Sequence, residues 1–387
     1  MSLESVVNIA DLRAAAKARL PRAVFDYLDG TADDGITGRD NIAAFSEVRF
    51  APRQAVMRHP DLSTTVLGQK LAMPFFLSPV GYLRLLNPKG DPAVARASAK
   101  AGVPFIQATG SGYPMDAVTP HTNLHFYQLY QMGGRAASER ALAKAKSLGV
   151  KGLFITVDTP VSGNRELDPR NGMAALMGAN HLKKIPYAPE VMRHPRWLLR
   201  FLLDGGVPPM PNVVDDAGKP LPALDVARAL AGANNNWTDL AWIRKNWDGP
   251  IVIKGLLRAD DARRAVDEGL DGIVVSNHGG RQLDSAPGTL RVLPGIAEAV
   301  KGKTTIFLDG GIRRGGDIVK ALCLGADAVL VGRAYVYGLV MGGEAGVARA
   351  IELLRNDMLR TMKLLGAEKL SDLSRDLVFL KDGFRID

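Results

Sequence analysis

Short apolar runs recur along the chain from Pro74 onward, and each is followed by a segment of helical character. This alternation is typical of strands joined by crossover helices, and it indicates a parallel sheet. The runs are Pro74 to Ser78, Pro104 to Ala108, His125 to Leu129, Leu153 to Val157, Ile251 to Ile253, Gly272 to Val275, Thr305 to Leu308 and Ala328 to Val331. Since eight parallel strands can close into a barrel, the pattern predicts an α/β fold, the (β/α)₈ TIM barrel.

An open, doubly wound sheet is the structural alternative. Its usual turn after the first strand, Gly-x-Gly-x-x-Gly, is not found in the first strand-helix units. Helices between the apolar runs have recognisable starts, such as Asp91-Pro92 before Ala93 to Ala101 and Asp260 before Asp261 to Glu268. The barrel is therefore favoured.

Two segments lie outside the repeat. Residues 1–73 contain helical stretches around Asp11 to Leu20 and Pro21 to Leu28, and we expect them to form a lid or plug at one barrel end. Residues 167–247, rich in Pro, Gly, Asn and Arg, separate the fourth and fifth strands and far exceed the usual length of such loops. The expected organisation is one domain, 1–387, with a helical extension at 1–73, a barrel at 74–387 and a long loop insertion at 167–247.

Composition narrows the class of protein. The 387 residues are 47% hydrophobic, which is enough for a sizeable core, and the net charge of +9 favours anionic partners in general. The single cysteine, Cys323, excludes an intrachain disulfide and lies in an apolar run typical of a core. The chain shows no secretory pattern at its start and no stretch of the ~18 apolar residues that a spanning helix needs. We expect a cytoplasmic protein.

Polar and charged residues follow nearly every predicted strand. In a parallel barrel these positions meet at one mouth, where such barrels carry out their chemistry. They are Pro79-Val80-Gly81, Thr109, Gln128 with Tyr130, Thr156 with Asp158 and Arg165, Lys254, Ser276 with His278 and Arg281, Asp309 with Arg313, and Gly332-Arg333.

The run from Ser276 to Asp284 carries the most specific chemistry. Histidine can take a proton near neutral pH, and arginine can bind a carboxylate through two parallel hydrogen bonds. His278 and Arg281 therefore indicate a base beside an anion clamp, suited to an anionic substrate. The alternative is a polar turn in which His278 is a satisfied surface residue.

Glycine and arginine recur after the last two predicted strands, in Asp309 to Gly316 and in Val331 to Arg333. This is the usual place of a phosphate cradle in such barrels, although solvated arginines on a glycine-rich turn are the alternative. Lys254 ends a strand inside the barrel and needs a partner there. A flavin ring that gains negative charge on reduction is one partner, and a Schiff base is the rival role.

These residues resemble the FMN-dependent α-hydroxy acid oxidase and dehydrogenase family over nearly the whole chain. The matching stretches are Phe25 to Tyr27, Ser78 to Gly81, Tyr127 to Tyr130, Thr156 to Pro160, Gly163 to Glu166, Ile253 to Gly255, Ser276 to Asp284, Leu308 to Gly315 and Val331 to Arg333. The resemblance implies an FMN-bearing barrel that oxidises an L-2-hydroxy acid to a 2-keto acid.

The resemblance also implies a role for each site residue. His278 takes a proton from the substrate, Asp158 stabilises the resulting imidazolium, and Arg165, Arg281, Tyr27 and Tyr130 bind the substrate. Lys254 lies by the flavin ring. The other residues implied to bind FMN are Pro79, Val80, Gly81, Thr109, Gln128, Thr156, Ser276, Asp309, Gly311, Arg313, Gly332 and Arg333. No metal is expected.

Two departures from the family pattern bear on specificity. Plant-type oxidases commonly have alanine at the position of Gly81, whereas many bacterial lactate and mandelate dehydrogenases have glycine. Gly81 therefore favours a dehydrogenase that passes electrons to a quinone or another acceptor. An oxygen-using oxidase, and an enzyme for a larger or carrier-bound hydroxy acid, remain alternatives. Gly110 and Gly112 predict a roomier pocket that accepts acids larger than glycolate.

The insertion contains a candidate membrane segment, 181–210. His181 to Arg200 has five Lys or Arg against one Glu, and Trp197 to Leu203 is a basic, aromatic and amphipathic run. Such a run can lie on an anionic membrane, here at its inner face, and the stretch His194 to Trp197 resembles that of membrane-associated dehydrogenases. The alternative is a helix whose apolar face packs on the barrel.

Rival functions are a Schiff-base aldolase that uses Lys254 and a non-catalytic binding module. The aldolase does not explain the set His278, Arg281, Arg165 and Asp158. No basic stripe with interleaved aromatic residues indicates nucleic acid. The family resemblance further implies a homo-oligomer, commonly a tetramer.

Overall fold

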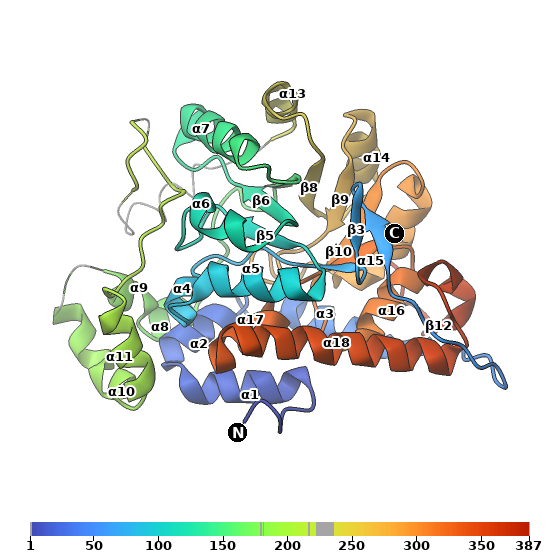
Figure 1. Cartoon of the computed structure of the whole chain (residues 1–387), viewed down its shortest axis with the longest axis horizontal. Helices are drawn as coiled ribbons and strands as arrows, with labels where there is room; N and C mark the ends of the chain where they lie inside the picture. The colour runs from blue at the N-terminus through green and yellow to red at the C-terminus, as the bar shows by residue number, and fades with distance from the viewer. Residues whose placement is uncertain (1, 179, 181, 216, 222–235, 387) are drawn as a thin grey trace.

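The computed structural model describes residues 2–386 except 179, 181, 216 and 222–235 (Figure 1). Parts of the predicted insertion at 167–247, and residue 181 of the predicted membrane segment 181–210, therefore lie outside the described residues.

Eight parallel strands form a closed barrel, which confirms the predicted fold. They are β4 (Phe75–Leu77), β5 (Phe105–Ala108), β6 (His125–Leu129), β7 (Leu153–Thr156), β8 (Ile251–Leu256), β9 (Gly272–Val275), β10 (Thr305–Asp309) and β11 (Ala328–Val331). The ring closes where β11 pairs with β4, with Leu330 opposite Phe76. Both faces of these strands are covered, which explains why they appear in the sequence as continuous apolar runs.

The inside of the barrel is filled by side chains. Phe76, Phe126, Phe154 and Phe307 come from β4, β6, β7 and β10 and pack edge to face, with ring centroids 5.1 Å apart for Phe76 and Phe307. Smaller apolar residues complete this cluster. Because the interior is packed, ligands have room only at the strand ends.

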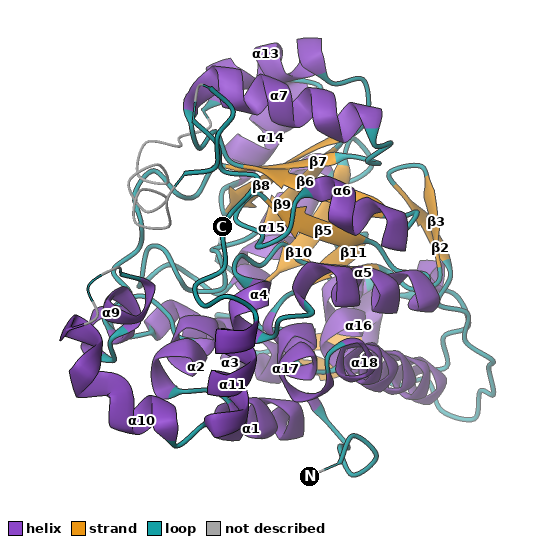
Figure 2. Cartoon of the chain, turned by 60° about the vertical axis from the view of Figure 1, so that its left-hand side comes forward, coloured by secondary structure: helices purple, strands orange, loops and turns teal. Residues whose placement is uncertain are grey.

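Helices surround the strands on the outside (Figure 2). They are α4 (Leu83–Leu86), α5 (Gly90–Ala101), α6 (Met115–Val118), α7 (Gly134–Ser147), α13 (Trp237–Asn246), α14 (Ala259–Asp267), α15 (Thr289–Val300), α16 (Gly315–Cys323), α17 (Arg333–Gly342) and α18 (Glu344–Leu365). Single turns are η1 (Thr119–His121), η3 (Leu370–Asp372) and η4 (Arg375–Leu377).

The N-terminal segment, residues 2–73, contacts both ends of the barrel. It forms α1 (Ile9–Arg19), α2 (Arg22–Asp29), α3 (Ile36–Glu47) and a hairpin of β2 (Thr64–Val66) and β3 (Gln69–Leu71). The hairpin packs Val66 and Leu71 on the interior cluster, at the end where β3 leads into β4. Helix α1 lies along α17 and α18 (Figure 1), and α2 brings Tyr27 to the opposite end. The strand β1 (Val48–Phe50) pairs with β12 (Val378–Leu380) near the C-terminus.

The insertion between β7 and β8 forms short helices: α8 (Leu167–Arg170), α9 (Met173–Met177), η2 (Leu182–Tyr187), α10 (Ala188–Met192) and α11 (Pro195–Leu203). In Figure 1, α10 and α11 lie at one corner of the molecule, away from the strands. The ring of Trp197 is buried, stacks on Phe201 at 4.8 Å, and donates from Nε1 to the carbonyl of Leu85 at 3.1 Å. One side of α11 therefore packs on the barrel.

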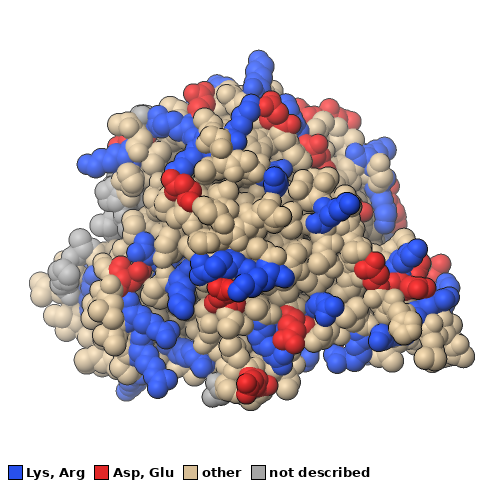
Figure 3. All heavy atoms as spheres, in the orientation of Figure 1, with Lys and Arg blue, Asp and Glu red and all other residues tan. Residues whose placement is uncertain are grey.

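The other side of α11 is open. Leu199, Leu202 and Leu203 are 59%, 61% and 79% exposed, and Leu182, Ile185 and Met192 of the neighbouring turns are exposed as well. Figure 3 shows an uncharged surface at this corner, bordered by Lys and Arg side chains. The amphipathic run thus has both a packed and an exposed apolar face.

Candidate active site

A cavity of about 780 Å³ opens at the carboxyl ends of the barrel strands. It brings together most of the predicted site residues, although they come from every part of the chain. Those that line it are Tyr27, Pro79, Val80, Gly81, Tyr130, Arg165, Lys254, His278, Arg281, Asp309, Gly311, Arg313, Gly332 and Arg333.

The other predicted residues, Thr109, Gln128, Thr156, Ser276 and Asp158, form the layer beneath the cavity. The amide of Gln128 donates to Thr156 Oγ1 at 3.1 Å, and the hydroxyl of Thr109 donates to the Gln128 carbonyl at 2.7 Å. The hydroxyl of Ser276 donates to Asp309 at 3.0 Å. These contacts hold the polar side chains at the mouth in fixed positions.

His278 and Asp158 form a hydrogen-bonded pair. Nδ1 of His278 lies 3.0 Å from Oδ1 of Asp158. His278 has φ +56°, a left-handed conformation that is costly for a residue with a side chain and that recurs at active sites. The backbone N-H of His278 donates to Ser276 Oγ at 3.1 Å, which stabilises this turn.

The pair has shifted pKa values. Burial lowers the pKa of His278 below its ordinary value, although the Asp158 carboxylate acts in the opposite direction. Burial by itself would raise the pKa of Asp158, but its interactions with His278, including the hydrogen bond, and the positive charge of Lys254 outweigh burial and lower that pKa. The site therefore holds a neutral imidazole beside an ionised carboxylate near neutral pH.

Gly255 explains how Asp158 reaches this position. A Cβ at Gly255 would lie 2.6 Å from Cβ of Asp158, and its φ of +114° also favours glycine. The strand β8 is irregular at this point, between Lys254 and Leu256. Lys254 itself is only 4% exposed, donates to Ser276 Oγ at 3.1 Å and lies 3.4 Å from Asp309 Oδ2. Gly255 therefore leaves room for the Asp158 side chain beside the strand that carries Lys254.

Two arginines line the same part of the cavity as His278. Arg281 donates from Nη1 to the Gly30 carbonyl at 2.9 Å and lies over the Tyr27 ring at 5.3 Å. The positive charge of Arg165 lies close enough to repel that of Arg281. Burial, together with the positive charges of Arg165 and Arg333, lowers the pKa of Arg281 to about 9. Such an excess of buried positive charge favours an anion in this part of the cavity.

Another part of the cavity wall is built from glycines and a helix N-terminus. Gly310 and Gly311 have φ values of +108° and +80°, and Gly332 precedes the first turn of α17. Backbone N-H groups at such a terminus favour phosphate. The side chain of Arg333 makes contacts that the sequence did not indicate: it donates to the carbonyls of Leu28, Gly279 and Gly30 at 3.2, 3.0 and 2.8 Å. It thereby ties α2 to the turn that carries His278.

Several lining residues were not singled out from the sequence, among them Tyr82, Met132, Asp168 and Met210. Tyr82 directly follows the matched stretch ending at Gly81, so its place was the easiest to infer. Asp168 and Met210 lie in the insertion, and no local pattern marks them.

The expectation that Gly112 enlarges the pocket is wrong. A Cβ at Gly112 would lie 2.7 Å from Cβ of Arg84, so this glycine makes room for the Arg84 side chain. Arg84 in turn pairs with Asp204 of the insertion at 2.8 Å. Gly110, by contrast, does line the cavity.

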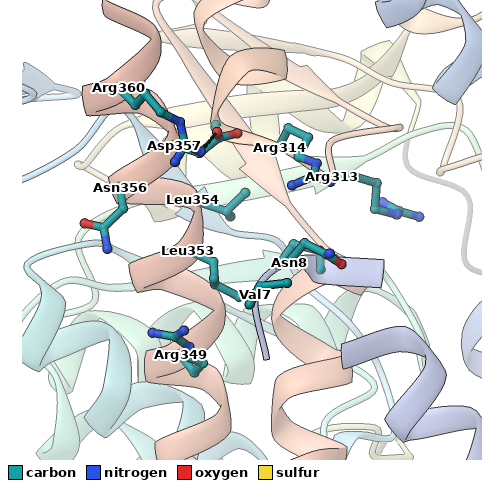
Figure 4. Close-up of a pocket in the computed structure, with 12 residues that line it drawn as sticks. Val7, Asn8, Arg313, Arg314, Arg349, Leu353, Leu354, Asn356, Asp357 and Arg360 are labelled. Carbon is teal, nitrogen blue, oxygen red and sulfur yellow. Dashed lines mark hydrogen bonds and ion pairs between the residues drawn. The ribbon is translucent and has the colours of Figure 1, made fainter. Parts of the chain in front are cut away.

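A second, smaller cavity of about 210 Å³ lies outside the mouth, between α1, α16 and α18 (Figure 4). Arg313, Arg314, Arg349 and Arg360 line it. The carboxylate of Asp357 accepts hydrogen bonds from Arg360 and from the Gly316 N-H. An acidic side chain of the protein thus already occupies part of this basic cleft, and the larger cavity is the candidate active site.

Comparison with known proteins identifies the family. The model of the FMN-dependent dehydrogenase family matches residues 16–380. The chain belongs to this family. An L-lactate dehydrogenase of Vibrio parahaemolyticus is 44% identical over 374 residues, covering 95% of this chain and 97% of that protein. The predicted family, its FMN cofactor and the assignment as an FMN-dependent L-2-hydroxy acid dehydrogenase or oxidase are confirmed.

Solved structures similar to this FMN-dependent dehydrogenase include proteins named as a mandelate dehydrogenase and a mandelate oxidase. The monotopic membrane protein (S)-mandelate dehydrogenase is 36% identical with a TM-score of 0.89, covering 97% of this chain and 100% of that one. A mandelate oxidase bound to (S)-2-phenylpropionate is 34% identical with a TM-score of 0.80, covering 97% and 99%. Relatives with the same fold thus include both a dehydrogenase and an oxidase.

The cavity of this FMN-dependent dehydrogenase fits the cofactor. Its volume of about 780 Å³ is within the range of sites for small molecules and cofactors. A buried lysine lies at its floor, and backbone N-H groups suited to phosphate lie at one end. Arg165 and Arg281 line the same cavity as His278, so the cavity also suits an anionic ligand.

Proposed function

We propose that this FMN-dependent dehydrogenase oxidises an L-2-hydroxy acid to the 2-keto acid, with His278 as the base. The observation that carries the proposal is the His278 and Asp158 pair, 3.0 Å apart, beside a cavity that Arg165 and Arg281 also line. The same reaction class was predicted from the sequence and agrees with the relatives. An aldolase would not need this combination.

Arg165 and Arg281 bind the substrate carboxylate. Arginine offers planar donors that match a carboxylate, and the existing contacts of both side chains leave further N-H groups free to bind it. Tyr27 and Tyr130 bind the carboxylate and the hydroxyl. Two points of attachment fix the carbon that carries the hydroxyl near His278.

His278 takes the proton from the substrate. Nδ1 of His278 donates its proton to Asp158, so Nε2 is left as the base. Asp158 then stabilises the imidazolium that forms. FMN, when bound, supplies the acceptor for the two electrons and the second hydrogen of the substrate. Lys254 would lie at the flavin ring. The other residues that would hold the ring, the ribityl chain and the phosphate are Pro79, Val80, Gly81, Thr109, Gln128, Thr156, Ser276, Asp309, Gly311, Arg313, Gly332 and Arg333.

We further propose a quinone as the final electron acceptor, and a peripheral position at the inner face of the membrane. No helix in the described part of the chain is long and apolar enough to cross a membrane. The exposed leucines of α11, bordered by Lys and Arg, can enter the headgroup region of an anionic bilayer instead. The similar mandelate dehydrogenase is named as a monotopic membrane protein. We also propose a homo-oligomer, which the family resemblance implies.

An oxygen-using oxidase is the second candidate. Mandelate oxidases are similar in structure over nearly the whole chain. Gly81 favours the dehydrogenase, because a residue without a side chain at this position is typical of the membrane-associated enzymes.

Anaerobic mixing of the FMN-loaded protein with a panel of 2-hydroxy acids tests the proposed reaction. We expect L-lactate, L-mandelate or a longer L-acid to bleach the flavin absorption band, while the D-acids do not. Reoxidation of the bleached protein by a short-chain quinone, compared with oxygen, then separates dehydrogenase from oxidase. A flavin that no 2-hydroxy acid bleaches would overturn the proposed reaction.

A further inference from the structure

The cavity has an apolar corner that the insertion completes. Met210 packs with Met132 and Val213 in a small buried cluster, and Tyr82 and Tyr130 pack against it. Met210 is only 5% exposed, yet it lines the same cavity as the proposed base and arginines. Part of the wall of the candidate substrate site is thus a flexible thioether from a distant segment.

Met210 lies directly over Gly110. A Cβ at Gly110 would lie 3.7 Å from Cε of Met210 and 3.9 Å from its Sδ, which is ordinary van der Waals contact. The same Cβ would lie 3.9 Å from Cα of Gly81, so the two glycines are adjacent on the cavity wall. The space that Gly110 leaves is therefore bounded by Met210 rather than open to solvent.

The backbone around Met210 is held in place by contacts with the barrel. Asn212 donates to the Tyr113 carbonyl at 2.9 Å, and Arg140 donates to the Asp215 carbonyl at 2.6 Å. The chain passes so near Gly133 that a Cβ there would overlap the Val214 carbonyl oxygen. The position of Met210 is therefore fixed, while its side chain can still change rotamer.

We propose that Met210 sets the size of the substrate side chain, and that the corner between Met210 and Gly110 receives an apolar side chain of the 2-hydroxy acid. This inference rests on the proposed function. Arg165 and Arg281 hold the carboxylate, and His278 faces the carbon that bears the hydroxyl. The third substituent of that carbon then meets the uncharged wall formed by Met132, Met210 and Gly110. An aliphatic or aromatic side chain is stabilised there by loss of apolar surface from water.

The first experiment compares Met210→Ala with the control Met210→Leu, which nearly conserves volume. We measure kcat/KM for L-lactate and for L-2-hydroxyoctanoate. Met210→Ala should raise the preference for the longer acid by about tenfold or more, a size typical of changes in an apolar pocket, and Met210→Leu should leave it within about threefold of wild type. An unchanged preference in Met210→Ala would overturn the inference.

Binding without turnover gives an independent measurement. Octanoate and propionate, which carry no hydroxyl, are titrated against the absorption spectrum of the oxidised flavin. The dissociation constant of octanoate should fall relative to that of propionate in Met210→Ala, and equal ratios in wild type and variant would count against the subsite.

A swap of side chains tests the contact itself. Gly110→Leu should lower kcat/KM for every acid, because the new side chain meets Met210, and adding Met210→Ala should restore lactate oxidation. Additive losses in the double variant would contradict the contact. The flavin content of each variant shows whether it has folded. If Gly110→Leu loses FMN, the inference is tested by the comparison of Met210→Ala with Met210→Leu alone. Failure of the proposed function appears separately, as a wild-type flavin that no acid bleaches.

Discussion

The imidazole of His278 hydrogen-bonds to the carboxylate of Asp158 over 3.0 Å, although the two residues follow different strands of the barrel. The contact depends on Gly255, since a side chain there would collide with Asp158. It also depends on the left-handed turn at His278. The pair thus requires a strained backbone at His278 and a residue without a side chain at position 255. Such strain is expected at a functional site.

Replacement of the base should separate cofactor binding from chemistry. His278→Ala removes the group that takes the substrate proton but none of the proposed phosphate-binding N-H groups. We expect a protein that retains FMN and whose anaerobic flavin reduction by L-lactate is slower by about 10² to 10⁴-fold. Stopped-flow absorbance measures the reduction, and a rate equal to that of wild type would overturn the role of His278.

The pH dependence of kcat/KM should report the protonation of His278 beside Asp158. The proposed reaction needs neutral His278, so activity is present above the pKa of this residue and is lost as the pH falls through it. Asp158 raises the pKa of His278 and burial lowers it. Asp158→Asn should therefore move the acidic limb of the kcat/KM profile to lower pH, and it should lower the maximal rate because the imidazolium loses its stabilising charge. A limb that stays in place would show that another group controls it.

Much of the fold could be predicted because parallel strands are buried on both faces and appear as apolar runs. The predicted and observed bounds of β9 and β11 agree, and β8 was predicted too short because its irregular end contains Gly255. The polar residues at the strand ends then indicated the cavity, since the barrel geometry brings those ends together.

Other features depend on tertiary contacts that no local pattern encodes. Met210 reaches the cavity from a segment without helical or strand periodicity. The side chain of Arg333 is directed to the carbonyls of Leu28, Gly279 and Gly30. Gly112 was interpreted as open space, whereas a neighbouring arginine fills it. In each case the partner lies far away in the sequence, so its position follows only from the folded chain.

Substitution at the carboxylate clamp should affect substrate affinity more than the chemistry. Arg281 is anchored to the Gly30 carbonyl and stacked over Tyr27, a geometry that lysine cannot reproduce. Arg281→Lys should lower kcat/KM for L-lactate by about 10²-fold, mainly through KM. Arg170→Lys is the matched control, because Arg170 is exposed and pairs with Glu166 at 3.1 Å. Similar losses in both variants would show that the loss does not come from the geometry of Arg281 in the cavity.

The exposed leucines of α11 should account for the proposed membrane contact. Burial of one leucine side chain is worth about 1.5 to 3 kcal/mol, so changing Leu199, Leu202 and Leu203 together to serine should weaken binding to anionic vesicles by well over tenfold. Trp197 and Phe201 keep the packed face of the helix, so flavin reduction by substrate should be unaffected. Leu364→Ser is the matched control, since Leu364 is 68% exposed but lies on α18, away from this corner. Vesicle flotation measures binding, and equal flotation of the triple variant and wild type would exclude α11 as the contact.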